Sequence, residues 1–266
     1  MKPVVYISGQ IEHREELNAA TEHFSIVTRR TLIEKDSLVI PRYTALPYNK
    51  ELCEDVEYLG SKMINSHREH EYVADLQNWY YDLEGLTPKT WFDLSEIPKY
   101  SKFVLKGQTN SKKFLWNTHM FAENRTAVND VYCNLLNDGH IGTQKIYIRE
   151  FVELRKLAEG FNGLPISEEY RFFVLDGKVV DAGFYWSSHV DDLLEGDFSL
   201  NPLEQVPESF IKEVVNRVSE NIRFFVFDVA RKADGSWIVI ELNDGQQSGL
   251  SEIDPKRFYE NLKAML

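Results

Sequence analysis

The stretch RFFVFDVARKADGSWIVIELN, residues 223–243, decides the fold, because two β-rich runs flank an Asp-Gly turn at 234–235. A hairpin centred on that two-residue turn makes opposed residue numbers sum to 469, which places Asp228 opposite Glu241. Asn243 follows on the same face, since strand side chains alternate with period two. The sequence therefore predicts an antiparallel ribbon with two facing carboxylates and a neighbouring amide.

The facing pair Asp228 and Glu241 lies among large apolar residues, which predicts that the pair is half-buried. Opposed strand positions hold their Cβ atoms about 4.5–5.5 Å apart, and like charges so placed repel each other. One carboxyl group would then have to protonate unless a cation compensates it. Two carboxylates and the amide oxygen of Asn243 form the hard oxygen set that Mg²⁺ accepts, usually together with substrate phosphates. The alternative is an exposed hairpin whose acidic side chains face water.

Composition limits the fold and the partners of the chain. Its 266 residues, 43% of them hydrophobic, are enough to bury about 70–75% of the unfolded surface. The net charge of −12 argues against extended nucleic acid as the main partner, while it allows a local basic pocket for a nucleotide. Cys53 and Cys133 have no metal-ligand spacing, so neither a zinc site nor a disulfide framework is predicted. Without a signal peptide or a long apolar run, we expect a cytoplasmic chain with no membrane span.

Hydrophobic periodicity divides the chain into three expected units: an amino-terminal α/β unit at residues 1–90, a lid subdomain at 91–144 and a carboxy-terminal core at 145–266. A second Asp-Gly turn, at 176–177, predicts that the core is a mostly antiparallel sheet, so the fold class is α+β. The expected helices are 15–24, 49–63, 69–83, 124–136, 208–221 and 255–265, and the expected strands are 4–8, 25–29, 38–40, 103–106, 114–120, 145–152, 170–174, 179–186 and the two of the opening ribbon.

Lys106 and Lys113 lie at the two ends of a polar loop that follows an apolar strand. A lysine in this position can direct its ammonium group at phosphates, and the loop can direct its backbone N–H groups at them as well. The loop is not a Walker A motif. Strand-terminal lysines mostly extend to solvent, so the alternative to phosphate binding is that these lysines are surface residues that keep the protein soluble.

Two further segments are candidates for ligand binding. The strand end Glu150-Phe151-Val152 can hydrogen-bond a purine through its backbone while Glu153 binds a ribose hydroxyl; an ordinary edge strand with charged ends is the alternative. Arg171 is flanked by aromatic residues, and the turn at 176–177 places it opposite residue 182. A half-buried arginine needs an anionic partner, which is either residue Glu169 or a substrate phosphate.

Other polar clusters do not indicate a catalytic site. The serines and histidines at 66–70 and 187–189 lack a G-x-S-x-G elbow, so surface or capping roles are predicted for them. The acidic segment at 191–197 lacks EF-hand spacing and is expected to be a solvated loop.

Several segments, in their order along the chain, resemble the ATP-grasp superfamily over about residues 42–243. RimK-type ligases of that superfamily show a similar succession of motifs. The Pro-Arg-Tyr segment at 41–43 resembles phage and bacterial ATP-grasp proteins of largely unassigned substrate, and a fainter likeness links the chain to eukaryotic cell-division-cycle ATP-grasp proteins that assist assembly of a translation initiation factor. The shared segments are Ile-Asn-Ser at 64–66, Leu-Thr-Pro-Lys-Thr at 86–90, Lys106 with its loop, Arg-Glu-Phe-Val at 149–152, Glu-Tyr-Arg-Phe-Phe-Val at 169–174, Asp228, and Glu-Leu-Asn at 241–243.

The resemblance implies an ATP-grasp fold in which ATP and Mg²⁺ lie between the lid and the carboxy-terminal sheet. It implies a ligase that activates a small-molecule or peptide carboxylate as an acyl phosphate, which an amine or a thiol then attacks. The alternatives are an ATP-binding assembly factor without turnover and a phosphotransferase. The implied contacts are Lys106 and Lys113 with phosphates, Glu150, Phe151 and Val152 with adenine, Glu153 with ribose, Arg171 with the transferred phosphoryl group, and Asp228, Glu241 and Asn243 with Mg²⁺.

One feature of the family pattern is missing. The first ATP-grasp lysine, in the helix before the Thr-Pro segment, is replaced here by Asp75-Leu76. Arg42 or Arg68 could supply the absent positive charge. The sequence specifies neither the two substrates nor the oligomeric state.

Overall fold

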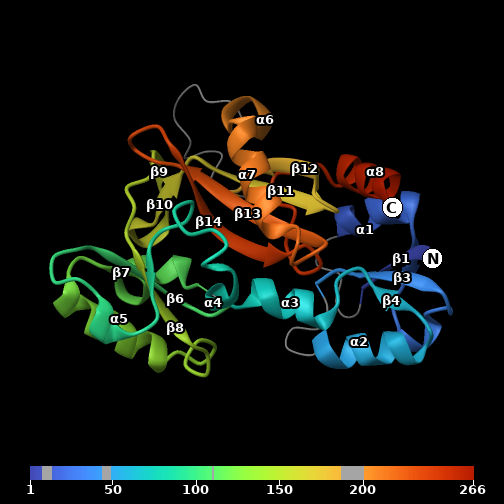
Figure 1. Cartoon of the computed structure of the whole chain (residues 1–266), viewed down its shortest axis with the longest axis horizontal. Coiled ribbons are helices and arrows are strands. Elements are labelled where there is room, and N and C mark those ends of the chain that lie inside the picture. Colours follow the sequence, from blue (N-terminus) through green and yellow to red (C-terminus); the bar gives the residue numbers. More distant parts are fainter. Residues whose placement is uncertain (8–13, 44–48, 110, 187–200) are drawn as a thin grey trace.

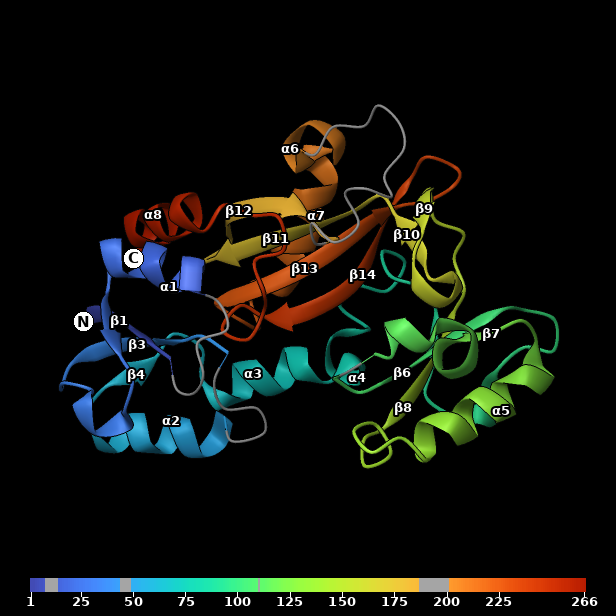
Figure 2. The same ribbon diagram turned by 180° about the vertical axis from the view of Figure 1, so that it is seen from behind.

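The computed structural model describes residues 1–7, 14–43, 49–109, 111–186 and 201–266. Figures 1 and 2 show an elongated arrangement in which the amino-terminal unit and the lid lie on either side of one antiparallel core sheet. The helices α3 and α4 run between the two outer parts, and the two chain termini lie at the same end of the molecule (Figure 1). Within the described residues, no helix is both long enough and apolar enough to span a membrane.

The amino-terminal unit is a parallel sheet of order β2-β1-β3-β4 with a helix on each face. Along β1, Val4 and Val5 point to opposite faces, so Val5 packs toward α1 and Val4 toward α2. The expected helix 49–63 ends early, because Gly60 adopts a positive φ of 72° and a short strand follows it. The elements are β1 (Lys2–Tyr6), α1 (Arg14–His23), β2 (Ser25–Val27), β3 (Ser37–Pro41), α2 (Asn49–Tyr58) and β4 (Lys62–Met63).

The expected helix 69–83 is divided in two at Asp75, whose φ and ψ of −117° and 112° are extended. Ser66 and Glu69 form a capping box at the start of α3 (His67–Ala74). Asp75 then caps α4 (Leu76–Trp79) and accepts hydrogen bonds from Lys145 and Tyr147, so the break attaches this segment to the lid.

The lid is an antiparallel sheet of order β5-β8-β6-β7 covered by α5. Strand β8 lies between β5 and β6, so it is a lid strand by its pairing, although the sequence division assigned it to the core. The prediction of a strand at 114–120 is wrong, because residues 116–120 form one π-helical turn. Met120 of this turn is buried, and Trp116 stacks on Phe121, which follows the turn. The elements are β5 (Thr90–Trp91), β6 (Phe103–Gly107), β7 (Phe121–Ala122), α5 (Arg125–Leu136) and β8 (Ile146–Glu150).

The core is an antiparallel sheet of order β12-β11-β13-β14. One face packs on α7, through residues such as Phe172, Phe227 and Leu242. A small antiparallel hairpin, β9 with β10, precedes the core sheet in the chain. The elements are β9 (Lys156–Glu159), β10 (Pro165–Ser167), β11 (Glu169–Leu175), β12 (Lys178–Phe184), α6 (Pro202–Gln205), α7 (Glu208–Val218), β13 (Phe224–Arg231), β14 (Trp237–Asp244) and α8 (Pro255–Met265).

The opposite face of the core sheet is divided along its length. Its apolar half, which includes Phe173 and Val226, packs on α1 and α8. Its polar half includes Arg171, Asp228 and Glu241, and Glu241 contacts Lys106 of the lid. Strand alternation therefore supplies both a core and a polar surface from the same strands.

Both core hairpins contain a one-residue bulge that sequence symmetry did not predict. The turn of the opening ribbon is one residue longer than expected, because Lys232 N–H donates to Ser236 O and Val229 pairs with Val239. One extra residue, Ile240, then restores the predicted pairing of Asp228 with Glu241. In the other hairpin the bulge makes the predicted pairing wrong, because residue 171 lies opposite Gly183 and not Ala182.

Candidate active site

Arg171 and Asp228 form a buried, two-point ion pair across β11 and β13. The Arg171 Nε and Nη2 groups each donate to one oxygen of Asp228 at 2.8 Å, and Nη1 donates to Gly249 O at 2.9 Å. Burial alone would lower the pKa of Arg171, but the adjacent carboxylate outweighs burial and raises it. The anionic partner of Arg171 within the protein is therefore Asp228 and not Glu169, which was one of the two partners, with a substrate phosphate, that the sequence left open.

Glu241 is paired with Lys106 of the lid strand β6. Burial alone would raise the pKa of Glu241, but the Lys106 and Lys113 ammonium groups outweigh burial and hold it at about 2. Each member of the facing acidic pair thus has its own cation from the chain. The cations that compensate the two carboxylates are thus side chains of the protein, and the predicted opposition of Asp228 and Glu241 is confirmed.

Glu169 is a buried carboxyl group that lacks a compensating partner of its own. Its Oε2 atom accepts only a long hydrogen bond, 3.4 Å, from Ser167, and Oε1 has no hydrogen-bond partner. Burial raises its pKa to about 7, although Lys113 opposes that shift. Lys113 donates to the Tyr185 hydroxyl at 2.5 Å. A positively charged or hydrogen-bonding ligand beside Glu169 would satisfy its free oxygen.

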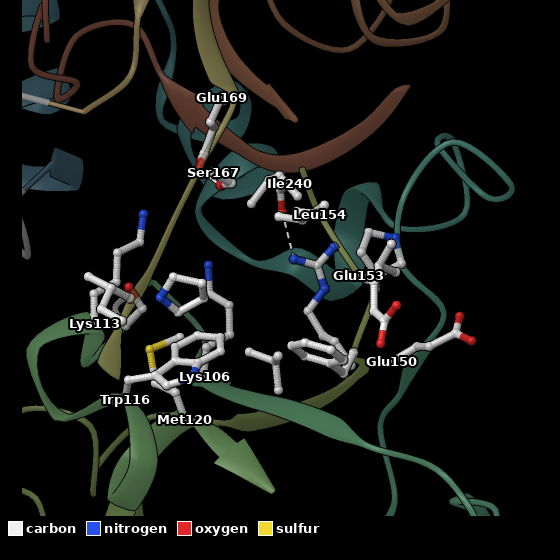
Figure 3. A pocket seen from close by; sticks show the side chains of 18 of the residues that line it. Lys106, Lys113, Trp116, Met120, Glu150, Glu153, Leu154, Ser167, Glu169 and Ile240 are labelled. Carbon is white, nitrogen blue, oxygen red and sulfur yellow. Dashed lines mark hydrogen bonds between the residues drawn. The ribbon is translucent and has the colours of Figure 1, made fainter. Parts of the chain in front are cut away.

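A pocket of about 400 Å³ lies between the lid and the polar half of the core sheet. Figure 3 shows Lys106 and Lys113 pointing toward Glu169, with Trp116 and Met120 beneath them and with Glu150 and Glu153 at the far end. Lys106 and Lys113 of the lid thus lie opposite Glu169 and Glu241 of the core sheet. The volume lies within the range of small-molecule sites.

The far end of the pocket presents backbone groups. Glu150 N–H donates to Lys89 O and Phe151 N–H to Lys102 O, at 2.7 and 3.0 Å. The N–H of Val152 has no hydrogen-bond partner among the described residues. The side chains of Glu150 and Glu153 are exposed at the pocket edge. An apolar ring with acceptor atoms could therefore bind the Val152 backbone here.

Arg149 also lines this pocket and was missed by the sequence analysis. Its Nη1 and Nη2 groups donate to Ile240 O at 2.6 Å and to Thr87 Oγ1 at 2.7 Å, while Nε has no partner. Burial lowers its pKa to about 10. A charged residue inside an alternating apolar strand was the available signal, because such a residue needs a partner.

The predicted site residues fall into two groups. Arg171 and Asp228 lie buried in the sheet beside the pocket, and Asn243 faces a smaller adjoining cavity. Among the described residues, no group of three His, Cys, Asp or Glu side chains could hold a metal ion, so a metal here would also need an amide or substrate oxygen. The predicted site residues that line the main pocket are Lys106, Lys113, Glu150, Phe151, Val152, Glu153 and Glu241.

Neither arginine expected to replace the missing lysine lines the pocket. Arg42 is fully buried and donates to Glu16 at 3.0 Å and to Ser248 O at 2.7 Å, so it joins the amino-terminal unit to the loop after β14. Arg68 is exposed on α3. The positive charges at the pocket come from the lid instead, with Arg149 added to the lysines.

The parallel unit, the lid and the antiparallel core, with a pocket between the last two, define an ATP-grasp domain. The chain belongs to the family described as ATP-grasp domain, R2K clade family 3, whose model matches residues 95–262. No curated protein matches the chain. The fold and the superfamily predicted from sequence are confirmed.

Solved ATP-grasp structures share this fold over nearly the whole chain. The ATP-grasp ligase PsnB, solved with a minimal precursor, is 12% identical with a TM-score of 0.59, and 100% of each chain is covered. A RimK domain ATP-grasp protein from Sphaerobacter thermophilus is 13% identical with a TM-score of 0.59, and 99% of each chain is covered. The D-alanine–D-alanine ligase of Bacillus anthracis, solved with ATP, is 14% identical with a TM-score of 0.61, covering 98% of this chain and 95% of that one.

Proposed function

We propose that this protein is an ATP- and Mg²⁺-dependent ligase that joins a carboxylic acid to an amine or a thiol through an acyl phosphate. The observation that supports it most is the Lys106–Glu241 ion pair, which joins the cationic lid to the acidic sheet at the wall of the pocket. Membership of the ATP-grasp family supports the nucleotide. The similar structures include the ATP-grasp ligase PsnB, solved with a precursor peptide, and a D-alanine–D-alanine ligase.

The donor set suits Mg²⁺. Asp228 and Glu241 are directly opposed, and Asn243 follows Glu241 on the same face, so two carboxylates and one amide can share a cation. Mg²⁺ binding would exchange one ion pair for another, because Lys106 would leave Glu241 for a phosphate oxygen. When bound, the metal would neutralise charge on the transferred phosphoryl group.

The other pocket residues would position ATP. Lys106, Lys113 and Arg149 would neutralise phosphates, the Val152 backbone would bind adenine, and Glu153 would bind ribose. Arg171 is held in place by Asp228, so its guanidinium is preorganised for developing charge. A peptide or small-molecule acid and an amine are the proposed substrates.

The test is ADP and phosphate release from Mg·ATP, screened over a matrix of acids and amines, with mass spectrometry of products. Acid- and amine-dependent release supports a ligase, whereas an assembly factor would retain ATP unchanged. The variants Asp228→Asn, Glu241→Gln and Lys106→Ala should each lose metal-dependent turnover. Full turnover in all three would contradict the site assignment.

A further inference from the structure

A second cavity, of about 230 Å³, lies where three parts of the molecule meet. The helices α3 and α4 form one wall, the end of β14 and the loop after it form another, and the polar loop after β6 closes the third. In Figure 2, α3 and α4 lie between the amino-terminal unit and the lid, beneath β14. The polar side chains that line it include His70, Gln108, Asn243, Asp244 and Ser248.

The two cavities share Lys106 and Glu241 in their lining. The ion pair between these residues therefore stands at the boundary of the cavities. A phosphoryl group held by Lys106 in the larger pocket would be within reach of a molecule in the smaller one. This arrangement suits a reaction in which a second substrate attacks from the smaller side.

His70 and Asp244 form a buried dyad in the wall of this second cavity. His70 Nδ1 lies 2.9 Å from Asp244 Oδ2, and both side chains are less than a tenth exposed. Asn65 and Gln246 donate three further hydrogen bonds to Asp244 at 2.8–2.9 Å, so the carboxylate is fixed in place. Because a carboxylate only accepts, Nδ1 carries a proton, so in the neutral imidazole Nε2 has the lone pair. Nε2 has no hydrogen-bond partner among the described residues.

The second cavity offers oxygen acceptors to an ammonium group. Besides the Lys106–Glu241 pair, the Asp244 carboxylate and the Ser248 hydroxyl line it. A primary amine reaches an enzyme at neutral pH mostly as its ammonium ion, and that ion must lose a proton before its nitrogen can attack. The cavity thus combines an attraction for the ammonium form with a nearby proton acceptor.

We infer that the second cavity binds the amine acceptor and that His70, oriented by Asp244, accepts the proton which the ammonium group loses; this inference rests on the proposed ligase function. The freed nitrogen pair forms the C–N bond, and the C–O bond to the phosphoryl group breaks with its electrons on the departing phosphate. The second proton of the attacking nitrogen leaves with that phosphate. The products are the amide, hydrogen phosphate and one proton on His70.

The first experiment compares two acceptors with the full chain. Hydroxylamine is mostly uncharged at neutral pH and needs no proton acceptor, whereas glycinamide is largely protonated. The His70→Asn variant keeps a donor to Asp244 but removes the base. It should lose about 100-fold or more of the glycinamide rate while hydroxamate formation changes by less than about threefold. His67→Asn is the matched control, because His67 stacks on His70 at 6.3 Å but does not line the cavity.

A second measurement needs no turnover. Histidine ring ¹⁵N NMR of the protein with Mg²⁺ and a non-hydrolysable ATP analogue should show the Nδ1–H form of His70. Glycinamide should shift its Nε2 resonance in a saturable way and leave that of His67 unchanged. An Nε2–H form, no shift of His70, or equal loss with both acceptors would overturn this inference and leave the ligase intact. Failure of the wild type to bind Mg·ATP would instead overturn the proposed function.

Discussion

Arg171 and Asp228 face each other directly on neighbouring antiparallel strands, and two parallel hydrogen bonds of 2.8 Å join them in the interior. This two-point geometry fixes the carboxylate plane that faces Glu241 across the next strand pair. The sheet therefore holds an arginine and two carboxylates side by side on three strands. The metal ligands proposed above are part of the folded core as well as of the site.

Asp228→Leu is expected to lower the free energy of unfolding by about 3–5 kcal/mol, because it leaves the Arg171 guanidinium buried without an anion. The double variant Arg171→Met/Asp228→Leu removes both charges and should recover at least half of that loss. Urea denaturation of the two variants measures the difference. Equal instability of the single and double variants would show that the pair does not act as an ion pair.

The Glu241 carboxylate should stabilise the fold in a pH-dependent way. Its pKa of about 2 lies below the ordinary 4.5, so its contribution is complete above pH 4.5 and is lost as the pH falls toward 2. Over that range the wild type should lose about 3 kcal/mol relative to Glu241→Gln. Denaturation across the acid range measures this, with Glu213→Gln on the exposed face of α7 as control. Parallel curves for wild type and Glu241→Gln would refute it.

Glu169 should have the opposite effect. Its pKa of about 7 lies above the ordinary 4.5, so stability is greatest below pH 4.5 and falls as the pH rises through 7. Glu169→Gln should remove that slope and stabilise the protein by about 3 kcal/mol above pH 7. Glu168→Gln is the contrast, because Glu168 is paired with Arg155 at 2.7 Å and its neutralisation should destabilise. Equal unfolding free energies of wild type and Glu169→Gln at pH 8 would refute the prediction.

Variants of Arg149 and Arg42 should distinguish an effect on nucleotide affinity from an effect on the stability of the fold. Arg149→Met should weaken Mg·ATP binding by about 10- to 100-fold, since it removes the buried guanidinium proposed to contact a phosphate in the pocket. Arg42→Met should leave that affinity unchanged and lower the melting temperature, because Arg42 is paired with Glu16 away from the pocket. Calorimetric titration and thermal melts measure the two effects. Reduced affinity in Arg42→Met alone would reverse the assignment.

The opening ribbon shows how far local sequence determines this fold. Its turn and its alternating runs predicted the pairing of Asp228 with Glu241, because both signals act within a few residues. The helix at 255–265 was predicted to the residue, since Asp254 caps it and Pro255 starts it.

Contacts between distant segments were not predictable. The turn at 116–120 depends on the packing of Trp116 against Phe121, and apolar residues at its two ends fit a strand equally well. The break at Asp75 depends on hydrogen bonds from Lys145 and Tyr147, seventy residues away and more. The cations for Asp228 and Glu241 likewise come from other strands, so spacing within the ribbon could suggest a metal but not an ion pair.

The predictions that fell at 187–189 and 191–197 lie outside the described residues. The expected roles of Lys106, Lys113 and the segment 150–153 remain proposals that nucleotide-binding experiments can decide. Local pattern suggested a phosphate near Lys106 and a purine near Val152, each with a commonplace alternative, and the resemblance favoured the binding roles.

Because of the bulge at Ile240, the number of residues in β14 determines which of its side chains face the pocket. Because of that one extra residue, Val239 and Leu242 both enter the apolar interior, three positions apart, while Ile240 and Glu241 both face the pocket. No single side chain encodes this local change of period, so point substitutions would leave it in place and only a deletion would remove it. A sequence alignment that places gaps freely between Gly235 and Glu241 would lose the position of the bulge. A redesign of the strand should therefore keep its number of residues fixed.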